Sequence, residues 1–233
     1  MRRTFAIGDI HGCKASLAAL LKQINPDPRH DSVIILGDFI NRGPDSRGTI
    51  DLLLALRESY RNFIVLRGNH EQMFLDYLTG HDQKLFLRVG GREMLTSYDA
   101  APLSSNDLLC DPAAWLPPSH RSLLADLSSF YENEHGIYVH AGLQPGVHLA
   151  QQSQQWLLWA REDFIDSSHN FGKPVIFGHT PFSSPLVMPN KIGIDTGAVY
   201  GGRLTCLILP EQEFVSVPGK RWWNDNRIQM SGF

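Results

Sequence analysis

Short apolar runs alternate with longer amphipathic stretches over the first 78 residues of the chain. The apolar runs occupy residues 5–7, 33–36 and 63–66, and their length and composition are typical of buried strands. Apolar residues recur at helical spacing in residues 14–24 and 46–56, and a third helix is expected at about 71–78. Asp45 or Ser46 is expected to cap the second helix. This alternation predicts a parallel sheet with crossover helices.

The pattern weakens between residues 79 and 129, where only short helical fragments are predicted. These fragments span about residues 83–89 and 121–127, and Gly90-Gly91, Pro112 and Pro117-Pro118 interrupt the stretch. We therefore expect one domain over residues 1–233, with a helical, cap-like insertion at about 80–130. A substrate-shaping role and a simple packing role are equally good interpretations of this insertion.

The second half of the chain is predicted to consist mainly of strands. A hairpin is expected from residues 130–132 and 136–140, followed by a strand at 174–177. Residues 191–195, 203–209 and 213–217 are interpreted as a final antiparallel meander, and the aromatic tail from residue 221 is expected to pack back or contact a partner. Parallel strands early and antiparallel strands late predict an α/β fold with mixed β-sheets flanked by helices.

The composition excludes several classes of protein. The chain has 42% hydrophobic and 19% charged residues, and its net charge of -3 gives no electrostatic footprint for nucleic acid. No apolar run approaches the roughly 18 residues of a membrane span, so no membrane contact is expected. Three cysteines lie far apart, at positions 13, 110 and 206, and predict a cytoplasmic protein without a disulfide framework.

Polar residues with metal-ligand chemistry follow the predicted strands directly. Asp9 and His11 are two positions apart at the end of the first strand, so in extended geometry both side chains point the same way. Asp38 ends the second strand and could bridge two ions with its two oxygens. Because ligands of open α/β sheets bind at the carboxyl ends of strands, we expect these side chains to converge.

Three further residues complete this set. Asn69 offers an amide oxygen, while His140 and His179 each follow a predicted strand and precede a small residue or Thr. Any one of these positions alone is as well explained by a turn or a cap. Together they suit two divalent transition metals, which would clamp a phosphoryl group and lower the pKa of a bound water.

The turn sequences resemble the signature series of calcineurin-like metallophosphatases of the phosphoprotein phosphatase type, and are most similar to the small bacterial and phage-lambda-type serine/threonine phosphatases. The matching segments are Gly8-Asp-Ile-His-Gly12, Gly37-Asp-Phe-Ile-Asn-Arg-Gly43, Arg67-Gly-Asn-His-Glu71, His140-Ala-Gly142, Trp159-Ala-Arg-Glu162, Gly178-His-Thr180 and Ile194-Asp-Thr-Gly-Ala-Val-Tyr-Gly-Gly202. The resemblance implies the layered metallophosphatase fold and hydrolysis of phosphomonoesters in a phosphoprotein or phosphopeptide. It also implies two divalent ions per chain, manganese first, with iron or zinc as alternatives.

The resemblance further implies a role for each matching residue. The first ion would be held by Asp9, His11 and Asp38, and the second by Asp38, Asn69, His140 and His179. Arg42 and Arg161, with Asn69, would bind the phosphate. A metal-bridging hydroxide would attack phosphorus in line, and His70 would protonate the leaving group. Glu71 is expected to cap the helix that follows it.

Asn41 departs from the family pattern, which usually has Asp at this position to hold the acid histidine. An amide oxygen can accept a hydrogen bond from His70 but supplies no negative charge, so we expect a lower pKa for His70 and a weaker acid. A weakly active, phosphate-binding module is therefore one alternative function. The other is a symmetrical dinucleoside-tetraphosphate hydrolase, which uses similar motifs.

Overall fold

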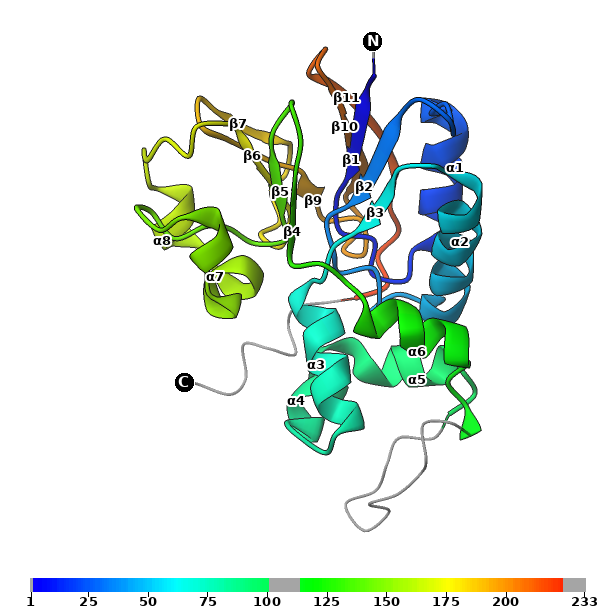
Figure 1. Cartoon of the computed structure of the whole chain (residues 1–233). Helices are drawn as coiled ribbons and strands as arrows, with labels where there is room; N and C mark the ends of the chain where they lie inside the picture. Colours follow the sequence, from blue (N-terminus) through cyan, green and yellow to red (C-terminus); the bar gives the residue numbers. More distant parts are fainter. Residues whose placement is uncertain (1, 101–113, 224–233) are drawn as a thin grey trace.

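Two β-sheets face each other in the computed structural model, which describes residues 2–100 and 114–223 (Figure 1). The first sheet comprises β1 (Thr4–Ile7), β2 (Ser32–Ile35), β3 (Phe63–Val65), β9 (Asp195–Thr196), β10 (Arg203–Leu209) and β11 (Glu213–Pro218). Its order is β11-β10-β1-β2-β3, with β9 paired to β10. The strands β1, β2 and β3 are parallel neighbours, as predicted, whereas β10 is antiparallel to β1. The crossover helices α1 (Lys14–Ile24) and α2 (Ser46–Ser59) cover the outer face of this sheet.

The second sheet is built from the later part of the chain. It comprises β4 (Phe130–Glu132), β5 (Ile137–Val139), β6 (Val175–Phe177), β7 (Leu186–Met188) and β8 (Lys191–Gly193), in the order β4-β5-β6-β8-β7. The predicted hairpin is present as the antiparallel pair β4 and β5. A 3-10 turn (Leu149–Gln151) and the helices α7 (Gln154–Trp159) and α8 (Glu162–Ile165) lie on the outer side.

Alternating side chains divide the strands between separate cores. In β1, Phe5 and Ile7 pack with the helices, while Ala6 packs between the sheets. In β5, Tyr138 also lies between the sheets, whereas its neighbour Val139 packs toward α7 and α8. Successive strand residues point to opposite faces, so each sheet buries both of its faces. The result is the predicted α/β fold, a helix–sheet–sheet–helix arrangement of mixed sheets.

Short helices from residues 69–125 form the part of the chain around the predicted insertion. They are α3 (Asn69–Leu78), α4 (Gln83–Phe86), a π-helical turn (Leu87–Gly91), α5 (Arg92–Ser97) and α6 (Pro118–Ala125). The buried His120 of α6 contacts the end of α5 and also α2, because its ring nitrogens lie 2.8 Å from the Tyr98 hydroxyl and 2.9 Å from the Asp51 carboxylate. This network ties α5 and α6 to α2.

One prediction about the strands was wrong. Residues 191–195 do not start a meander: β8 pairs with β6 and β7 in the second sheet, while Asp195 already belongs to β9 in the first. The chain changes sheets after Gly193, and β7 was not predicted. Pro112, Cys110 and the tail from residue 224 lie outside the described residues. None of the helices in the described ranges has the length and apolar character needed to cross a membrane.

Candidate metal and phosphate site

The loops that follow β1, β2 and β3 meet at the carboxyl ends of these strands. The backbone amides of Ile10 and His11 both donate to the carbonyl of Asp38, at 3.1 and 2.8 Å, which joins the loops after β1 and β2. The loop after β3 joins them because the amide of His70 donates to the Asp38 carboxylate at 3.0 Å. The predicted convergence of these three strand ends is therefore confirmed.

Several candidate site residues adopt a left-handed backbone conformation. These are His11, Asp38, Asn41, Arg42 and His179, with φ between 46° and 68°. Non-glycine residues rarely adopt positive φ, and where surrounding structure enforces it such strain gathers at functional sites. At Arg42 the surrounding structure contributes, because Gly90, in the π-helical turn, packs against the Arg42 backbone and accepts its N–H at 3.1 Å.

Glu71 fixes two of the loops relative to each other. Its buried carboxylate accepts the amide of Gly68 at 2.8 Å, which confirms the predicted helix cap. It also accepts three amides from the loop after β2, those of Asp38, Phe39 and Ile40, at 2.8 to 3.2 Å. Burial and the neighbouring Asp38 raise the pKa of Glu71 to about 8, while the amide bonds act in the opposite direction. The sequence did not predict the contact with the second loop.

Acceptor atoms converge on Asp38 from the side of the second sheet. His140 donates its Nδ1 proton to the carbonyl of Leu36 at 2.9 Å, so its neutral ring presents a lone pair at Nε2. That lone pair lies 3.0 Å from the Asn69 oxygen and 3.4 Å from Asp38 Oδ1. Burial lowers the pKa of His140, which favours the neutral ring. As the Asn69 amide is placed, three acceptor atoms lie close together here, an arrangement that fits a cation.

His179 extends this group. Its Nδ1 lies 3.1 Å from the same Asn69 oxygen, and its buried Nε2 has no partner among the described residues. Burial, followed by the charges of neighbouring groups, holds the pKa of His179 well below its usual range. Ligand-type atoms of Asp38, His140 and His179 lie within 4.8 Å of one another, and all three residues are buried.

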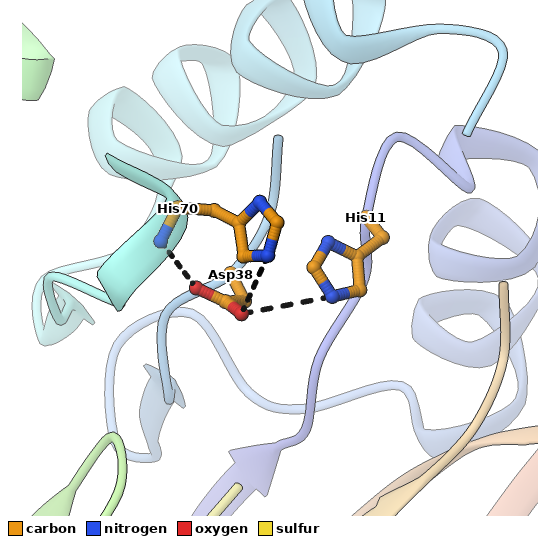
Figure 2. Close-up of side chains that lie close together, drawn as sticks. All are labelled: His11, Asp38 and His70. Atoms are coloured by element: carbon orange, nitrogen blue, oxygen red, sulfur yellow. Dashed lines mark hydrogen bonds and ion pairs between the residues drawn. The ribbon is translucent and has the colours of Figure 1, made fainter. Parts of the chain in front are cut away.

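A second group of ligand atoms lies on the other side of Asp38 (Figure 2). It consists of His11, Asp38 and His70, also within 4.8 Å of one another. His11 donates Nδ1–H to the carbonyl of Ile40 at 2.9 Å, which leaves Nε2 as an acceptor 3.6 Å from Asp38 Oδ2. A guanidinium N–H of Arg42 donates to that Nε2 at 2.7 Å. Burial, followed by the charge of Arg42, lowers the pKa of His11 to about 3.

Asp9 lies beside these two groups rather than within them. Both of its carboxylate oxygens accept the backbone amide of His179, at 3.1 Å. Burial and the carboxylates of Asp195 and Asp38 raise the pKa of Asp9 well above its ordinary value. Asp38 raises the pKa of Asp195 as well, and buried carboxylates this close need a positive partner in order to ionise together. This donor set fits divalent cations.

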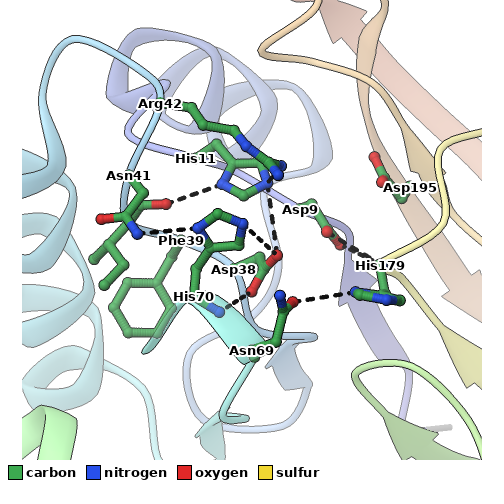
Figure 3. Close-up of polar contacts among 12 residues, drawn as sticks. Asp9, His11, Asp38, Phe39, Asn41, Arg42, Asn69, His70, His179 and Asp195 are labelled. Carbon is green, nitrogen blue, oxygen red and sulfur yellow. Dashed lines mark hydrogen bonds and ion pairs between the residues drawn. The ribbon is translucent and has the colours of Figure 1, made fainter. Parts of the chain in front are cut away.

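Asp195 is the site residue that the sequence reasoning did not single out. It is 4% exposed, faces Asp9 across the site (Figure 3) and accepts the amide of Gly197 at 3.0 Å. Burial raises its pKa to about 6. The available signal was its position in the segment of residues 194–202, where it again follows an apolar run.

His70 and Asn41 meet as the sequence predicted. Nδ2 of the Asn41 amide lies 3.0 Å from His70 Nδ1, and Oδ1 of that amide is buried with no partner in the described chain (Figure 3). Exchanging the two amide atoms, which are equivalent in shape, lets Oδ1 accept the Nδ1 proton of His70. Burial, then the charges of Arg42 and His11, hold the pKa of His70 well below its usual range.

The two arginines differ in how they are placed. Arg42 is half-buried and lies over the ring of Tyr200, with its Cζ 5.6 Å from the ring centre. Arg161 is exposed at the start of α8 and forms no hydrogen bond with the site in the described residues, although its charge lowers the pKa of His140 and His179. Next to it, the exposed indole of Trp159 lies 6.3 Å from the ring of His179.

Known phosphatases and dinucleoside tetraphosphatases are similar to this chain in sequence and fold. The chain is 34% identical to serine/threonine-protein phosphatase 1 of Salmonella typhimurium over 210 residues, which cover 88% of this chain and 90% of the relative. It is 26% identical to the asymmetrical bis(5'-nucleosyl)-tetraphosphatase PrpE of Bacillus thuringiensis, over 91% of this chain and 92% of that protein. A solved structure of a candidate diadenosine tetraphosphatase superposes with a TM-score of 0.72 at 25% identity and covers 95% of this chain and 94% of the other.

A cold-active protein-tyrosine phosphatase of a Shewanella species shares the fold, with a TM-score of 0.62 at 16% identity, over 93% of this chain and 77% of that one. The sequence profile of the calcineurin-like phosphoesterases matches residues 2–198, most of the chain. Together with the buried carboxylate, amide and imidazole groups at the strand ends, this match shows that the chain belongs to the calcineurin-like phosphoesterase family of metal-dependent hydrolases.

Proposed function

We propose that the protein hydrolyses phosphomonoesters of serine or threonine in phosphoproteins, using two divalent cations. The observation that carries this proposal is the sharing of Asp38 by two groups of ligand-type atoms, one containing His11 and the other containing His140 and His179. A shared carboxylate between two such groups is the arrangement expected for a pair of ions. The 34% identity with serine/threonine-protein phosphatase 1 supports the choice of substrate.

The residues fall into two proposed ligand sets. Asp9, His11 and Asp38 would hold one ion, and Asp38, Asn69, His140 and His179 the other. When bound, the ions would bind phosphate oxygens and lower the pKa of a water so that it can attack at neutral pH. Imidazole and carboxylate ligands suit manganese, iron and zinc alike, and we propose manganese first.

Two arginines are proposed to bind the phosphate. The guanidinium of Arg42 already points at the site, because it donates to His11 Nε2 at 2.7 Å. With a cation on His11, that N–H is released to bind a phosphate oxygen, for which the planar guanidinium is well shaped. Arg161 would approach from α8 on the opposite side, beside His179, and Asn69 would add its amide.

His70 is proposed as the general acid. Its Nδ1 is engaged by Asn41 at 3.0 Å, and its Nε2 lies 3.9 Å from Asp38 Oδ2. A proton on Nε2 therefore faces the proposed ions and the bond that breaks. The neutral amide of Asn41 orients this ring but does not stabilise its charged form, so the acid is weaker than one paired with a carboxylate.

Hydrolysis of a dinucleoside polyphosphate is the second candidate function. The exposed Trp159 favours it, because an indole next to His179 offers a surface on which a nucleobase can stack. The identity with PrpE over 91% of this chain points the same way. That relative is named as asymmetrical, so we do not restrict the reaction to symmetrical cleavage.

The test compares substrates on one preparation of the manganese-loaded chain. Turnover is measured for a phosphoserine peptide, a phosphotyrosine peptide and diadenosine tetraphosphate, with the nucleotide products separated by anion-exchange chromatography. The proposal predicts the highest kcat/KM for the phosphoserine peptide and loss of all turnover after EDTA treatment. Preference for diadenosine tetraphosphate would establish the second candidate, and phosphopeptide binding without turnover would establish a binding module.

A further inference from the structure

A cavity of about 640 Å³ lies at the other end of the first sheet, beside the amino ends of β1 and β2. Its walls come from the residues before β1, from the loop before β2 and from the turn before β3. The charged groups in the wall are four arginines, Arg2, Arg3, Arg29 and Arg61, and two carboxylates, Asp27 and Asp31. Positive groups are therefore in excess here, although the whole chain has a net charge of -3.

The two carboxylates are already occupied by the loop that carries them. Asp31 is 3% exposed and accepts the backbone amides of Arg3, at 3.2 Å, and of Asp27, at 2.8 Å. It also pairs with the Arg3 guanidinium at 3.2 Å. Asp27 accepts the amides of Arg29 and His30 at 2.8 and 3.1 Å. Little acceptor capacity remains for the other arginines.

Three guanidinium groups are left without a carboxylate. Among the described residues, no carboxylate lies within ion-pair distance of Arg2, Arg29 or Arg61, and all three side chains are exposed. Like charges gathered around a concave surface repel one another and raise the local concentration of anions. This arrangement is unfavourable alone and becomes favourable when an anion enters.

The wall that carries these arginines is held together by backbone hydrogen bonds. The amide of Arg61 donates to the carbonyl of Pro28, and the amide of Ser32 donates to the carbonyl of Arg3, both at 2.9 Å. The turn before β3 and the start of β1 are thereby fixed to the loop before β2. An anion would therefore not have to order the backbone that carries these arginines.

The lining also indicates what kind of anion fits. All eight lining residues are charged, histidine or asparagine, and none is aliphatic. A ligand with a large aliphatic part would find no aliphatic side chain to pack against, whereas phosphate oxygens match guanidinium geometry. The volume far exceeds one phosphate group. A short chain of linked phosphates satisfies both requirements.

We propose that this cavity is a second anion site that binds a short inorganic polyphosphate. It is separate from the metal and phosphate site, because six residues of extended chain, about 20 Å, separate Arg3 from Asp9. In Figure 1 the amino end of β1, marked N, points away from α3 and the loops of that site. The two sites therefore use opposite ends of the same strands.

Isothermal titration with tripolyphosphate tests the proposal on the full chain. EDTA is present because tripolyphosphate itself chelates divalent cations, and thermal unfolding checks that the chain is folded under these conditions. We expect one binding site, and a loss of at least about tenfold in affinity in Arg61→Glu and in Arg29→Glu, since each reverses a charge at the cavity. Arg121→Glu, the same change on an exposed residue of α6, is the matched control and should bind as the unmodified chain does.

Three results would overturn the proposal. The first is unchanged affinity in both Arg61→Glu and Arg29→Glu. The second is loss of binding in Arg42→Ala, which would assign the anion to the other site. The third is much tighter binding of ATP than of tripolyphosphate, which would require recognition of the base. Hydrolysis of p-nitrophenyl phosphate by manganese-loaded Arg61→Glu, expected at the unmodified rate, shows that this variant is folded.

Discussion

At the carboxyl ends of β1 and β2, buried acceptor atoms outnumber the protons available to them, whereas at the amino ends exposed guanidinium donors outnumber the carboxylates. At both ends, carboxylates accept backbone amides and so hold the loops in place. Glu71 takes four backbone amides at one end, and Asp27 and Asp31 take four at the other. These carboxylates are therefore not available to other groups. The groups that remain are unpaired acceptor atoms at the carboxyl ends, which suit cations, and unpaired guanidinium groups at the amino ends, which suit an anion.

Asp38→Asn should have the largest effect. It acts at the acceptor-rich end, the carboxyl ends of β1 and β2. The change removes the charge shared by both ligand groups but keeps the shape. Altering even an outer partner of a metal ligand typically costs roughly 10–100-fold, so we expect a loss above about 100-fold in both manganese affinity and turnover. Metal content after gel filtration and p-nitrophenyl phosphate hydrolysis are the measurements. Asp82→Asn, on an exposed residue, is the control, and full metal content in Asp38→Asn would show that Asp38 is not a ligand.

Glu71→Gln tests whether the Glu71 carboxylate holds the loops after β2 and β3 together at the acceptor-rich end. Both Glu71 oxygens accept two amides each, and the amide NH₂ of Gln would face two N–H donors instead. Two buried donors without acceptors should reduce the free energy of unfolding by roughly 2–6 kcal/mol. Urea unfolding of the metal-free chain measures this, with Glu58→Gln on the exposed side of α2 as control. A difference below about 0.5 kcal/mol, the usual size for surface changes, would mean that Glu71 does not hold the loops together.

The sequence predicted the acceptor-rich end far better than the donor-rich one. Asp9 and Asp38 could be found because each follows an apolar strand, and parallel strands bring their carboxyl ends together. The role of Glu71 was found only in part, since a local cap can be recognised in sequence but a contact with residues 38–40 depends on how two loops fold. Asp195 was missed although it too follows an apolar run, because residues 191–195 were interpreted as one strand and no local pattern marks the change of sheets after Gly193.

The arginine cavity left no pattern at all in the sequence. Arg3, Arg29 and Arg61 lie on three segments that come together only through strand pairing, and single arginines are ordinary surface residues. The left-handed conformation of Arg42 is equally invisible, because arginine is not a residue that favours positive φ. The spacing of residues along the sequence thus predicts which side chains lie at strand ends, but not which side chains are brought together by contacts between loops.

Asn41→Asp should strengthen the proposed acid. A carboxylate accepting the Nδ1 proton of His70 favours the charged ring and raises its pKa toward the ordinary range, against the burial that now lowers it. The reverse exchange in a serine-protease triad changes the rate by about 10⁴, so an increase of about tenfold or more in kcat is expected for the phosphoserine peptide. p-Nitrophenyl phosphate, whose leaving group needs little protonation, should gain less.

That difference between substrates makes the test specific. A general improvement in folding or in metal content would raise both rates by the same factor. Equal increases, or no increase for the phosphoserine peptide, would therefore contradict the role of Asn41 and His70 in protonating the leaving group. Asn170→Asp, on an exposed loop, controls for the added charge.

Asp27→Asn should have the smallest effect, and it acts at the donor-rich end. Both amides that bind Asp27 do so through one oxygen, Oδ1, so an asparagine keeps both hydrogen bonds and the shape of the loop. The amide of Arg29 lowers the pKa of Asp27, so at neutral pH the exchange removes a full negative charge from the cavity. One unit charge at about 7 Å in water corresponds to roughly a threefold change in the binding constant, so tripolyphosphate should bind about threefold more tightly.

Titration calorimetry at low and high salt measures this, and the gain in affinity should shrink at high salt because the groups are exposed. Weaker binding in Asp27→Asn would mean that the carboxylate helps to hold the anion, and the excess of positive charge would then not explain the cavity.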